Sequence, residues 1–263
     1  RQIDFVLLTH AHIDHSGLLP RLCALGFRGP ILTTRATVDL LSVMLLDSAF
    51  IQESEWARAQ RQRARQPRAD APALLYTVAQ AQACLEQLQG TSYDEDVQPH
   101  ASVRCRFRDA GHILGSAILE VWVSEMGRSR KLVFSGDLGQ PGRPIVRDPT
   151  PIDSADVLVV ESTYGNRLHR PLGETIDELV FVIEDTLRRR QGNIIIPAFA
   201  LGRTQELLHL LLDLCRRGKY VLFPRPGGPV STNACPAPAA VSRTKSRWNV
   251  SSGTSYPRGT KKS

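Results

Sequence analysis

Short apolar runs alternate along the chain with longer amphipathic segments. Runs of about four to eight apolar residues predict strands, and apolar residues spaced three or four positions apart predict helices. The predicted strands are residues 3–8, 30–33, 102–107, 117–123, 131–135, 156–161, 193–197 and 219–223. The predicted helices are residues 17–26, 35–47, 50–66, 77–88, 173–190 and 203–217. This alternation indicates an α/β protein built of helix and sheet layers.

The pattern changes abruptly after Phe223. Residues 225–263 contain no acidic residue and no histidine, and they are rich in Pro, Gly, Ser, Thr, Lys and Arg. This composition is typical of disorder. The chain also begins at Arg1, inside a predicted core strand and without an initiator methionine. We therefore expect a fragment that ends in a disordered or aberrant tail.

The formal charge of +7 does not by itself indicate a nucleic-acid-binding protein. Residues 225–263 contain seven Lys and Arg and no acid, so residues 1–224 have a net charge of zero. A local basic run remains in and just after the predicted helix 50–66, where its members are Arg58, Arg61, Arg63, Arg65 and Arg68. We interpret this run as a solvated helix face rather than as an RNA-binding patch.

The distribution of cysteines and the hydropathy of the chain indicate which cellular compartment to expect. The five cysteines are scattered, odd in number and without a Cys-x-x-Cys motif. This distribution predicts reduced thiols in a cytoplasmic protein. Since no apolar run approaches the roughly 20 residues that a membrane span needs, we expect no membrane association.

Residues 9–17, Thr-His-Ala-His-Ile-Asp-His-Ser-Gly, hold three of the seven histidines. In an extended segment, His10 and His12 point to the same side, and Asp14 and His15 then turn toward a second position. Imidazole and carboxylate groups are the ligands of catalytic zinc. The alternative is a His-rich surface loop with incidental metal affinity. The alternating pattern between a predicted buried strand and an apolar helix favours a metal site.

Two later segments carry further metal-binding side chains. Asp109–Ala117 follows a predicted strand and contains His112, and Leu132–Gly139 is an apolar run that leads to Asp137. Taken in order, the three motifs resemble the signature of the metallo-β-lactamase superfamily, which is His-x-His-x-Asp-His followed by a later His and a bridging Asp. The resemblance implies the four-layer αββα sandwich of that superfamily, present here in part.

Two more segments narrow the resemblance. Val157–Arg167 reads as a buried strand that ends at Glu161, and Ile194–Glu206 reads as a strand, a turn and a helix that begins near Arg203. Both are similar to the β-CASP branch, whose members process RNA and DNA, and most similar to its RNA-processing nucleases. Glu161 matches the first added motif of that branch, with an ordinary salt bridge as the alternative. Arg203 is either a phosphate contact at a helix start or a surface arginine, and both interpretations stay open.

The resemblance covers about residues 1–223 and implies a domain plan. Residues 1–167 correspond to the metallo-β-lactamase domain without its first strands, and residues 168–224 to the start of an inserted β-CASP α/β domain. Residues 225–263 form the tail. Family members carry two further histidines beyond this point. One partners the acid that corresponds to Glu161, and the other completes the second metal site.

The resemblance implies a zinc-dependent phosphodiester hydrolase that acts on RNA. Asp137 would bridge two zinc ions, of which His10, His12 and His112 hold one, and Asp14 and His15 the other. A water between the ions would attack the phosphate, with Asp14 and Glu161 as catalytic candidates and Glu161 assisting the leaving oxygen. Because the family's later histidines are missing, we expect this chain to be weakly active or inactive.

Two rival functions remain open at this stage. One is a small-molecule metallohydrolase of the glyoxalase II or lactamase type, and the other is a non-catalytic metal-binding subunit of a processing complex. DNA in place of RNA, and a homodimer in place of a monomer, also stay open as alternatives.

Overall fold

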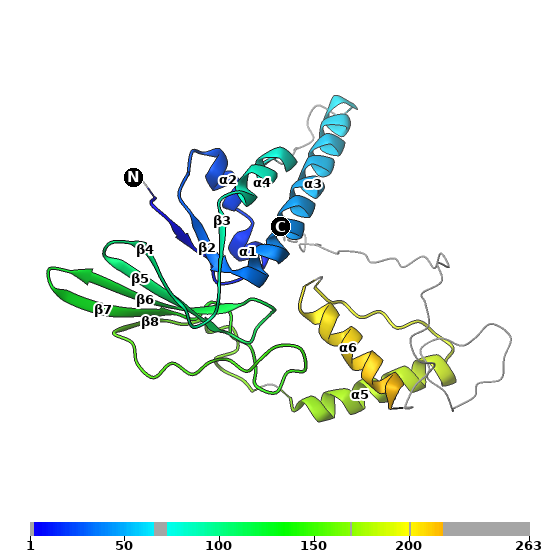
Figure 1. The fold of residues 1–263 in the computed structure, drawn as a ribbon. Coiled ribbons are helices and arrows are strands. Elements are labelled where there is room, and N and C mark those ends of the chain that lie inside the picture. Colours follow the sequence, from blue (N-terminus) through cyan, green and yellow to red (C-terminus); the bar gives the residue numbers. More distant parts are fainter. Residues whose placement is uncertain (1–2, 66–72, 169, 200, 218–263) are drawn as a thin grey trace, which may run out of the picture. The chain divides into compact units, whose positions relative to one another are not determined.

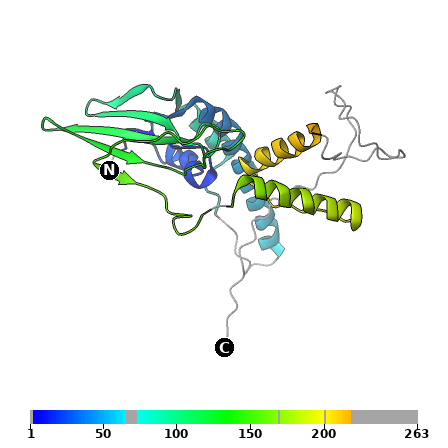
Figure 2. The ribbon, with the colours of Figure 1, turned by 90° about the horizontal axis from the view of Figure 1, so that it is seen from below.

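The computed structural model describes residues 3–65, 73–168, 170–199 and 201–217. The chain divides into two compact units, Arg1–His169 and Arg170–Ser263, and each is described by itself. Most elements of both are labelled in Figure 1, and Figure 2 shows them from below. None of the helices in the described residues combines the length and the apolar character needed to cross a membrane.

The first unit begins with a parallel three-stranded sheet. Its strands β1 (Val6–Leu7), β2 (Ile31–Thr34) and β3 (Leu88–Thr91) lie in the order β1-β2-β3. Parallel neighbours need a crossover connection. Helices α1 (Ile13–Ser16) and α2 (Leu19–Ala24) lie between β1 and β2, and helices α3 (Arg35–Arg65) and α4 (Val78–Leu85) lie between β2 and β3.

A second sheet of five strands completes the first unit. The strands follow one another in space as in sequence, and the last pair is parallel whereas the others are antiparallel. Their bounds are β4 (Asp96–His100), β5 (Val103–Asp109), β6 (Ala117–Glu125), β7 (Arg128–Phe134) and β8 (Val157–Val159).

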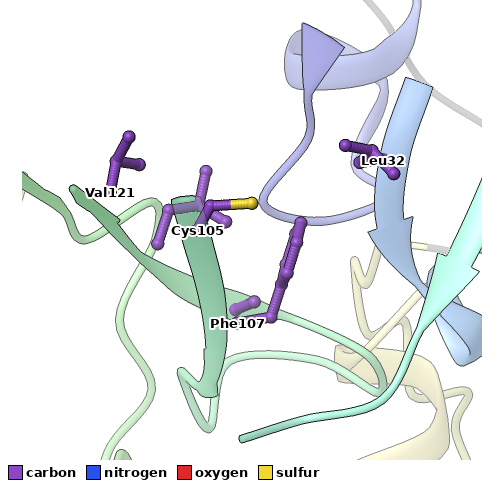
Figure 3. Packing of buried hydrophobic residues seen from close by; sticks show 6 residues of the cluster. Leu32, Cys105, Phe107 and Val121 are labelled. Carbon is purple, nitrogen blue, oxygen red and sulfur yellow. The ribbon is translucent and has the colours of Figure 1, made fainter. Parts of the chain in front are cut away.

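The two sheets pack against each other around Phe107. The side chains of Cys105 and Phe107 on β5 are fully buried and share one apolar cluster with Leu32 of β2 and Val121 of β6. Figure 3 shows Cys105 and Phe107 projecting toward the strand that carries Leu32. Burial of such side chains is the main favourable term in folding, so this cluster joins the sheets into one unit.

Helices cover the other face of the first sheet. The long helix α3 contacts β2 and β3, and it packs against α4, which in turn packs on α2. Within the described part of the first unit, the layers are therefore helix, sheet and sheet (Figure 1). The predicted α/β class is confirmed, and these layers correspond to three of the four in the αββα plan.

The second unit contains two packed helices. Helix α5 (Leu172–Glu184) continues into the π-helical turn η1 (Asp185–Arg189), and α6 (Arg203–Arg216) follows. Ile183 of α5 and Leu214 of α6 are the buried centre of their apolar contact.

The prediction of two helices over residues 35–47 and 50–66 was wrong, because α3 runs unbroken from Arg35 to Arg65. Asp47 and Ser48 are weak helix formers, but each costs only a few tenths of a kcal/mol. Leu45 and Ala49 are fully buried beneath this stretch, and packing of that kind overrides propensity.

Strands β3 and β4 were not predicted from the sequence. Both are edge strands of their sheets and carry few apolar residues. In β4 the exposed residues alternate with half-buried ones, and Pro99 is tolerated because an edge strand needs fewer backbone donors.

The strand predicted at 193–197 does not form, because no described segment pairs with it. Ile194 packs against the helices instead, while Ile195 is exposed. The strand predicted at 219–223 and the tail at 225–263 lie outside the described residues.

Candidate metal centre

The loop between β1 and α1 carries the first histidines of the centre. His10 lies three residues after Leu7, the last residue of β1, and is fully buried. The Ser16 hydroxyl is 2.9 Å from the carbonyl of Ala11 and 3.0 Å from that of His12. The loop is thus fastened to the first turn of α1, and the side chains of His10 and His12 converge, with His10 Nε2 3.2 Å from His12 Nδ1.

His112 reaches the same point from the loop between β5 and β6. Its Nε2 lies 3.1 Å from His12 Nδ1. The two loops are joined directly, because the backbone N–H of Ala117 donates to the carbonyl of Thr9 over 2.8 Å. This bond sets the first strand of one sheet beside the central strand of the other.

Asp137 arrives from the end of β7, after a turn at Gly136. Gly136 has φ +55°, and a Cβ there would lie 2.9 Å from the Cβ of Thr9. Only glycine suits both the backbone conformation and this close approach. The turn brings Asp137 Oδ2 to 3.5 Å from His112 Nε2 and 3.7 Å from His10 Nε2.

Four donor atoms therefore surround one point. One atom each from His10, His12, His112 and Asp137 lie within 4.8 Å of one another. Ligand bonds of about 2.0–2.1 Å in a tetrahedron place neighbouring donors about 3.3 Å apart. Of the separations between these atoms, four run from 3.1 to 3.7 Å and none exceeds 4.8 Å, so the donor set fits a tetrahedral metal ion.

A second group of donors shares Asp137. His15 Nε2 lies 3.3 Å from Asp137 Oδ1 and 3.6 Å from Asp14 Oδ2. The two oxygens of Asp137 thus face different histidines, because Oδ2 faces His10 and His112 and Oδ1 faces His15. The ring of His15 lies 4.1 Å from that of His10, which places the two groups side by side.

Burial keeps the innermost imidazoles neutral. The pKa of His10 is lowered to about 2, first because the ring is buried and then because the rings of His15, His12 and His112 surround it. Burial also lowers the pKa of His112, whereas the carboxylates of Asp137 and Glu161 act in the opposite direction. Neutral imidazole is the form that binds a metal.

Thr9 is a residue of this centre that the sequence analysis missed. Its hydroxyl lies 3.1 Å from His10 Nδ1, on the side of the ring away from His12. A partner on the second ring nitrogen fixes the tautomer and the orientation of a metal-binding histidine. Its position directly before the His-x-His motif is the only signal in the sequence.

Glu161 is hydrogen-bonded to residues on both sides of Asp137 in the chain. Its Oε1 accepts a hydrogen bond of 2.6 Å from the backbone N–H of Leu138, and its Oε2 accepts one of 2.8 Å from the Thr163 hydroxyl. Its own N–H donates to the Ser135 hydroxyl. Glu161 is thus tied to both ends of the turn that carries Asp137.

Arg203 belongs to the second unit, where it begins α6. Its Nη1 lies 3.2 Å from Glu206 Oε2, and the side chain is more than half exposed. An arginine in this surface ion pair is compatible with both interpretations left open by the sequence, so its substrate role stays a prediction.

Known proteins that are similar to this chain support the assignment of a metal centre. The model of the metallo-β-lactamase superfamily matches residues 1–31, which include the His-x-His-x-Asp-His motif. A ribonuclease of Thermus thermophilus, TTHA0252, is 36% identical over 80% of this chain and 43% of its own length. The transcription termination factor FttA of Methanothermobacter thermautotrophicus is 33% identical over 82% and 32%, and an RNase J-like protein of Methanocaldococcus jannaschii is 30% identical over 83% and 46%.

Residues 1–31 of the chain therefore match the metallo-β-lactamase superfamily, and about four fifths of the chain resembles these relatives. The names of these relatives confirm the predicted resemblance to its RNA-processing members. The chain spans less than half the length of each of them. Among solved structures, a B3 metallo-β-lactamase aligns with 83% of this chain and 71% of its own, at 16% identity and a TM-score of 0.32. The match to the family model and the His/Asp cluster together support a bound metal ion.

Proposed function

We propose that this chain is the metal-binding part of a ribonuclease that hydrolyses RNA phosphodiester bonds with two zinc ions. The observation that carries the proposal is the arrangement around Asp137, whose Oδ2 faces His10 and His112 and whose Oδ1 faces His15. Centres with two metal ions about 3.5–4 Å apart are common in enzymes that cleave phosphate esters.

Each ion has its own ligands in this proposal. The first would be held by His10, His12 and His112, the second would be held by Asp14 and His15, and Asp137 would be shared. Bound zinc supplies Lewis acidity and lowers the pKa of water toward neutrality. The chain contributes the lowered pKa of His10, which keeps this ligand unprotonated at neutral pH.

Glu161 is the candidate for assisting the leaving oxygen, together with the later histidine that partners this acid in family members. The charge of its carboxylate opposes the lowering of the His112 pKa by burial. The hydrogen bonds from Leu138 and Thr163 hold its two oxygens in a fixed direction. A positioned carboxyl group of this kind suits proton transfer. Asp14 is the second catalytic candidate, as a ligand beside the reacting phosphate.

Three observations support the substrate and the setting. The relatives are named ribonucleases and termination factors, which favours RNA over a thioester or a lactam. The N-terminal end of a helix attracts phosphate, so Arg203 at the start of α6 is a candidate phosphate contact. The cysteines in the described residues are free thiols, which supports a reducing, cytoplasmic location.

The test compares substrates and variants under the same conditions. The zinc-loaded chain, in excess over substrate so that slow turnover is visible, is incubated with a labelled RNA and separately with a thioester. We expect RNA cleavage that is lost in Asp137→Asn, because an amide offers one neutral oxygen in place of two charged ones. Hydrolysis of the thioester without cleavage of RNA would point to a small-molecule hydrolase. RNA cleavage that survives in Asp137→Asn would exclude the centre as its source.

A further inference from the structure

The loop that carries His112 is tied together by one buried serine. The Ser116 hydroxyl accepts hydrogen bonds from the backbone N–H groups of His112, over 3.0 Å, and Ile113, over 3.2 Å. The carbonyl of Ser116 accepts from the N–H of Ala110 and from the Tyr93 hydroxyl. Residues 110–116 are therefore joined by hydrogen bonds into one loop, and whatever anchors this loop also places the imidazole of His112.

The loop 110–116 is anchored where β2 ends and the first turn of α3 begins. The hydroxyls of Thr34 and Thr37 lie 2.7 Å and 2.9 Å from the carbonyl oxygen of Gly115, and both threonines are buried. A carbonyl has two acceptor lone pairs, and each hydroxyl has one hydrogen to donate. Both hydrogens are thus accommodated on one oxygen, and the Thr34 hydroxyl remains free to accept from the N–H of Thr37 over 3.2 Å.

Gly115 makes this close approach possible. It has φ +80°, and a Cβ on it would lie 2.7 Å from both the backbone nitrogen and the hydroxyl oxygen of Thr37. The loop therefore sits directly on the helix start with no side chain between them. Because α3 is the longest helix of the first unit and packs on β2 and β3, it provides a rigid support.

The geometry points to Thr34 and Thr37 as positioning residues of the metal centre. Their hydroxyls hold Gly115, three residues from His112, and thereby set the position of His112 Nε2 opposite His12 and Asp137. The inference rests on the proposed metal function. It adds that the metal affinity of the first ligand group depends on two hydroxyls that touch neither a metal nor a ligand side chain.

The experiment measures zinc affinity by competition with a chromophoric chelator, and the ligand environment by the visible spectrum of the Co²⁺ form. Thr37→Val removes the hydroxyl at nearly constant volume, and Thr37→Ser keeps it. Loss of a supporting hydrogen bond around a metal commonly lowers affinity by about 10–100-fold, so we expect roughly a tenfold loss and an altered Co²⁺ spectrum in Thr37→Val. Thr37→Ser should bind like the wild type.

The matched control removes a buried hydroxyl elsewhere in the same unit. Tyr76 is almost fully buried, its hydroxyl lies 3.1 Å from that of Ser48, and neither residue touches the metal centre. Tyr76→Phe should change thermal stability but not zinc affinity. If Thr37→Val does not fold, zinc affinity is measured on Thr37→Ala in its place, because alanine removes the hydroxyl and adds no atoms.

Three results would overturn the inference. The first is a zinc affinity in the folded hydroxyl-less variant equal to that of the wild type, and the second is a loss of zinc binding in Tyr76→Phe to the same extent. In both cases the wild type still binds zinc, and the proposed function stands. Absence of zinc from the wild-type chain would instead overturn the proposed function together with the inference.

Discussion

His12 Nδ1 lies 3.1 Å from His112 Nε2, although the two residues are 100 positions apart in the chain. The contact joins the loop after the first strand of one sheet to the loop between the central strands of the other. Each histidine comes from a connection at a strand end, where sites are commonly built on a rigid scaffold. The metal centre therefore exists only when both sheets are packed together.

The first prediction concerns His112. Replacement by alanine removes one of four donors, and the first zinc ion should bind at least tenfold more weakly, whereas the fold should persist. The measurement is chelator competition on the purified chain. His100→Ala is the control, because His100 is exposed at the end of β4 and bonds to Ser102. Equal losses in the two variants would mean that His112 has no special place in zinc binding.

The second prediction concerns removal of metal. A ligand that binds the folded state stabilises it by an amount that grows with its concentration, about 2.7 kcal/mol at 100 times the dissociation constant. Saturating zinc should therefore raise the melting temperature of the wild-type chain, and a chelator should reverse the rise. Calorimetric scans with and without zinc measure this effect. The same zinc addition should raise the melting temperature of His112→Ala much less.

The third prediction tests the packing of the two sheets. Phe107 is fully buried between them, and truncation of a buried phenylalanine to alanine costs about 3–5 kcal/mol. Phe107→Ala should lower the free energy of unfolding by that amount, as measured by urea denaturation. Phe50→Ala, at an exposed position of α3, should lie within about 0.5 kcal/mol of the wild type. A small effect of Phe107→Ala would contradict the arrangement of the sheets.

The fourth prediction concerns the close contact of two glycines. A Cβ on Gly139 would collide with the backbone of Gly111, beside His112, and with the N–H of His112 itself. Gly139→Ala should destabilise the chain by about 1–3 kcal/mol, as overpacking does, and should also weaken zinc binding. Gly173 lies in α5 with nothing near its missing Cβ, so Gly173→Ala should be neutral or stabilising by up to about 1 kcal/mol. Thermal unfolding and zinc titration of both variants provide the comparison.

Much of the fold could be predicted from local pattern. The strand that contains Phe107 alternates buried and half-buried residues, and the strand that contains Leu119 begins with a run of buried residues, so both stand out in the sequence. Strands β3 and β4 did not stand out, because they carry few apolar residues and are mostly exposed or half-buried. The strand predicted at 193–197 does not form for a different reason. Its residues are apolar, but no described strand pairs with them.

Some residues of the candidate site could be predicted from the sequence, and others could not. His10, His12, His112 and Asp137 could be predicted because imidazole and carboxylate groups at strand ends have a recognisable chemistry. Thr34 and Thr37 could not, because a threonine at a helix start usually serves only as a cap. Their link to Gly115 crosses about 80 residues of sequence and becomes visible only in three dimensions.

The central claim is that Asp137 joins two metal sites into one centre. The most direct measurement is the zinc content of the purified, zinc-equilibrated chain by plasma mass spectrometry, after removal of loosely bound metal. We predict two zinc ions per wild-type chain. One ion or none per chain would contradict the account.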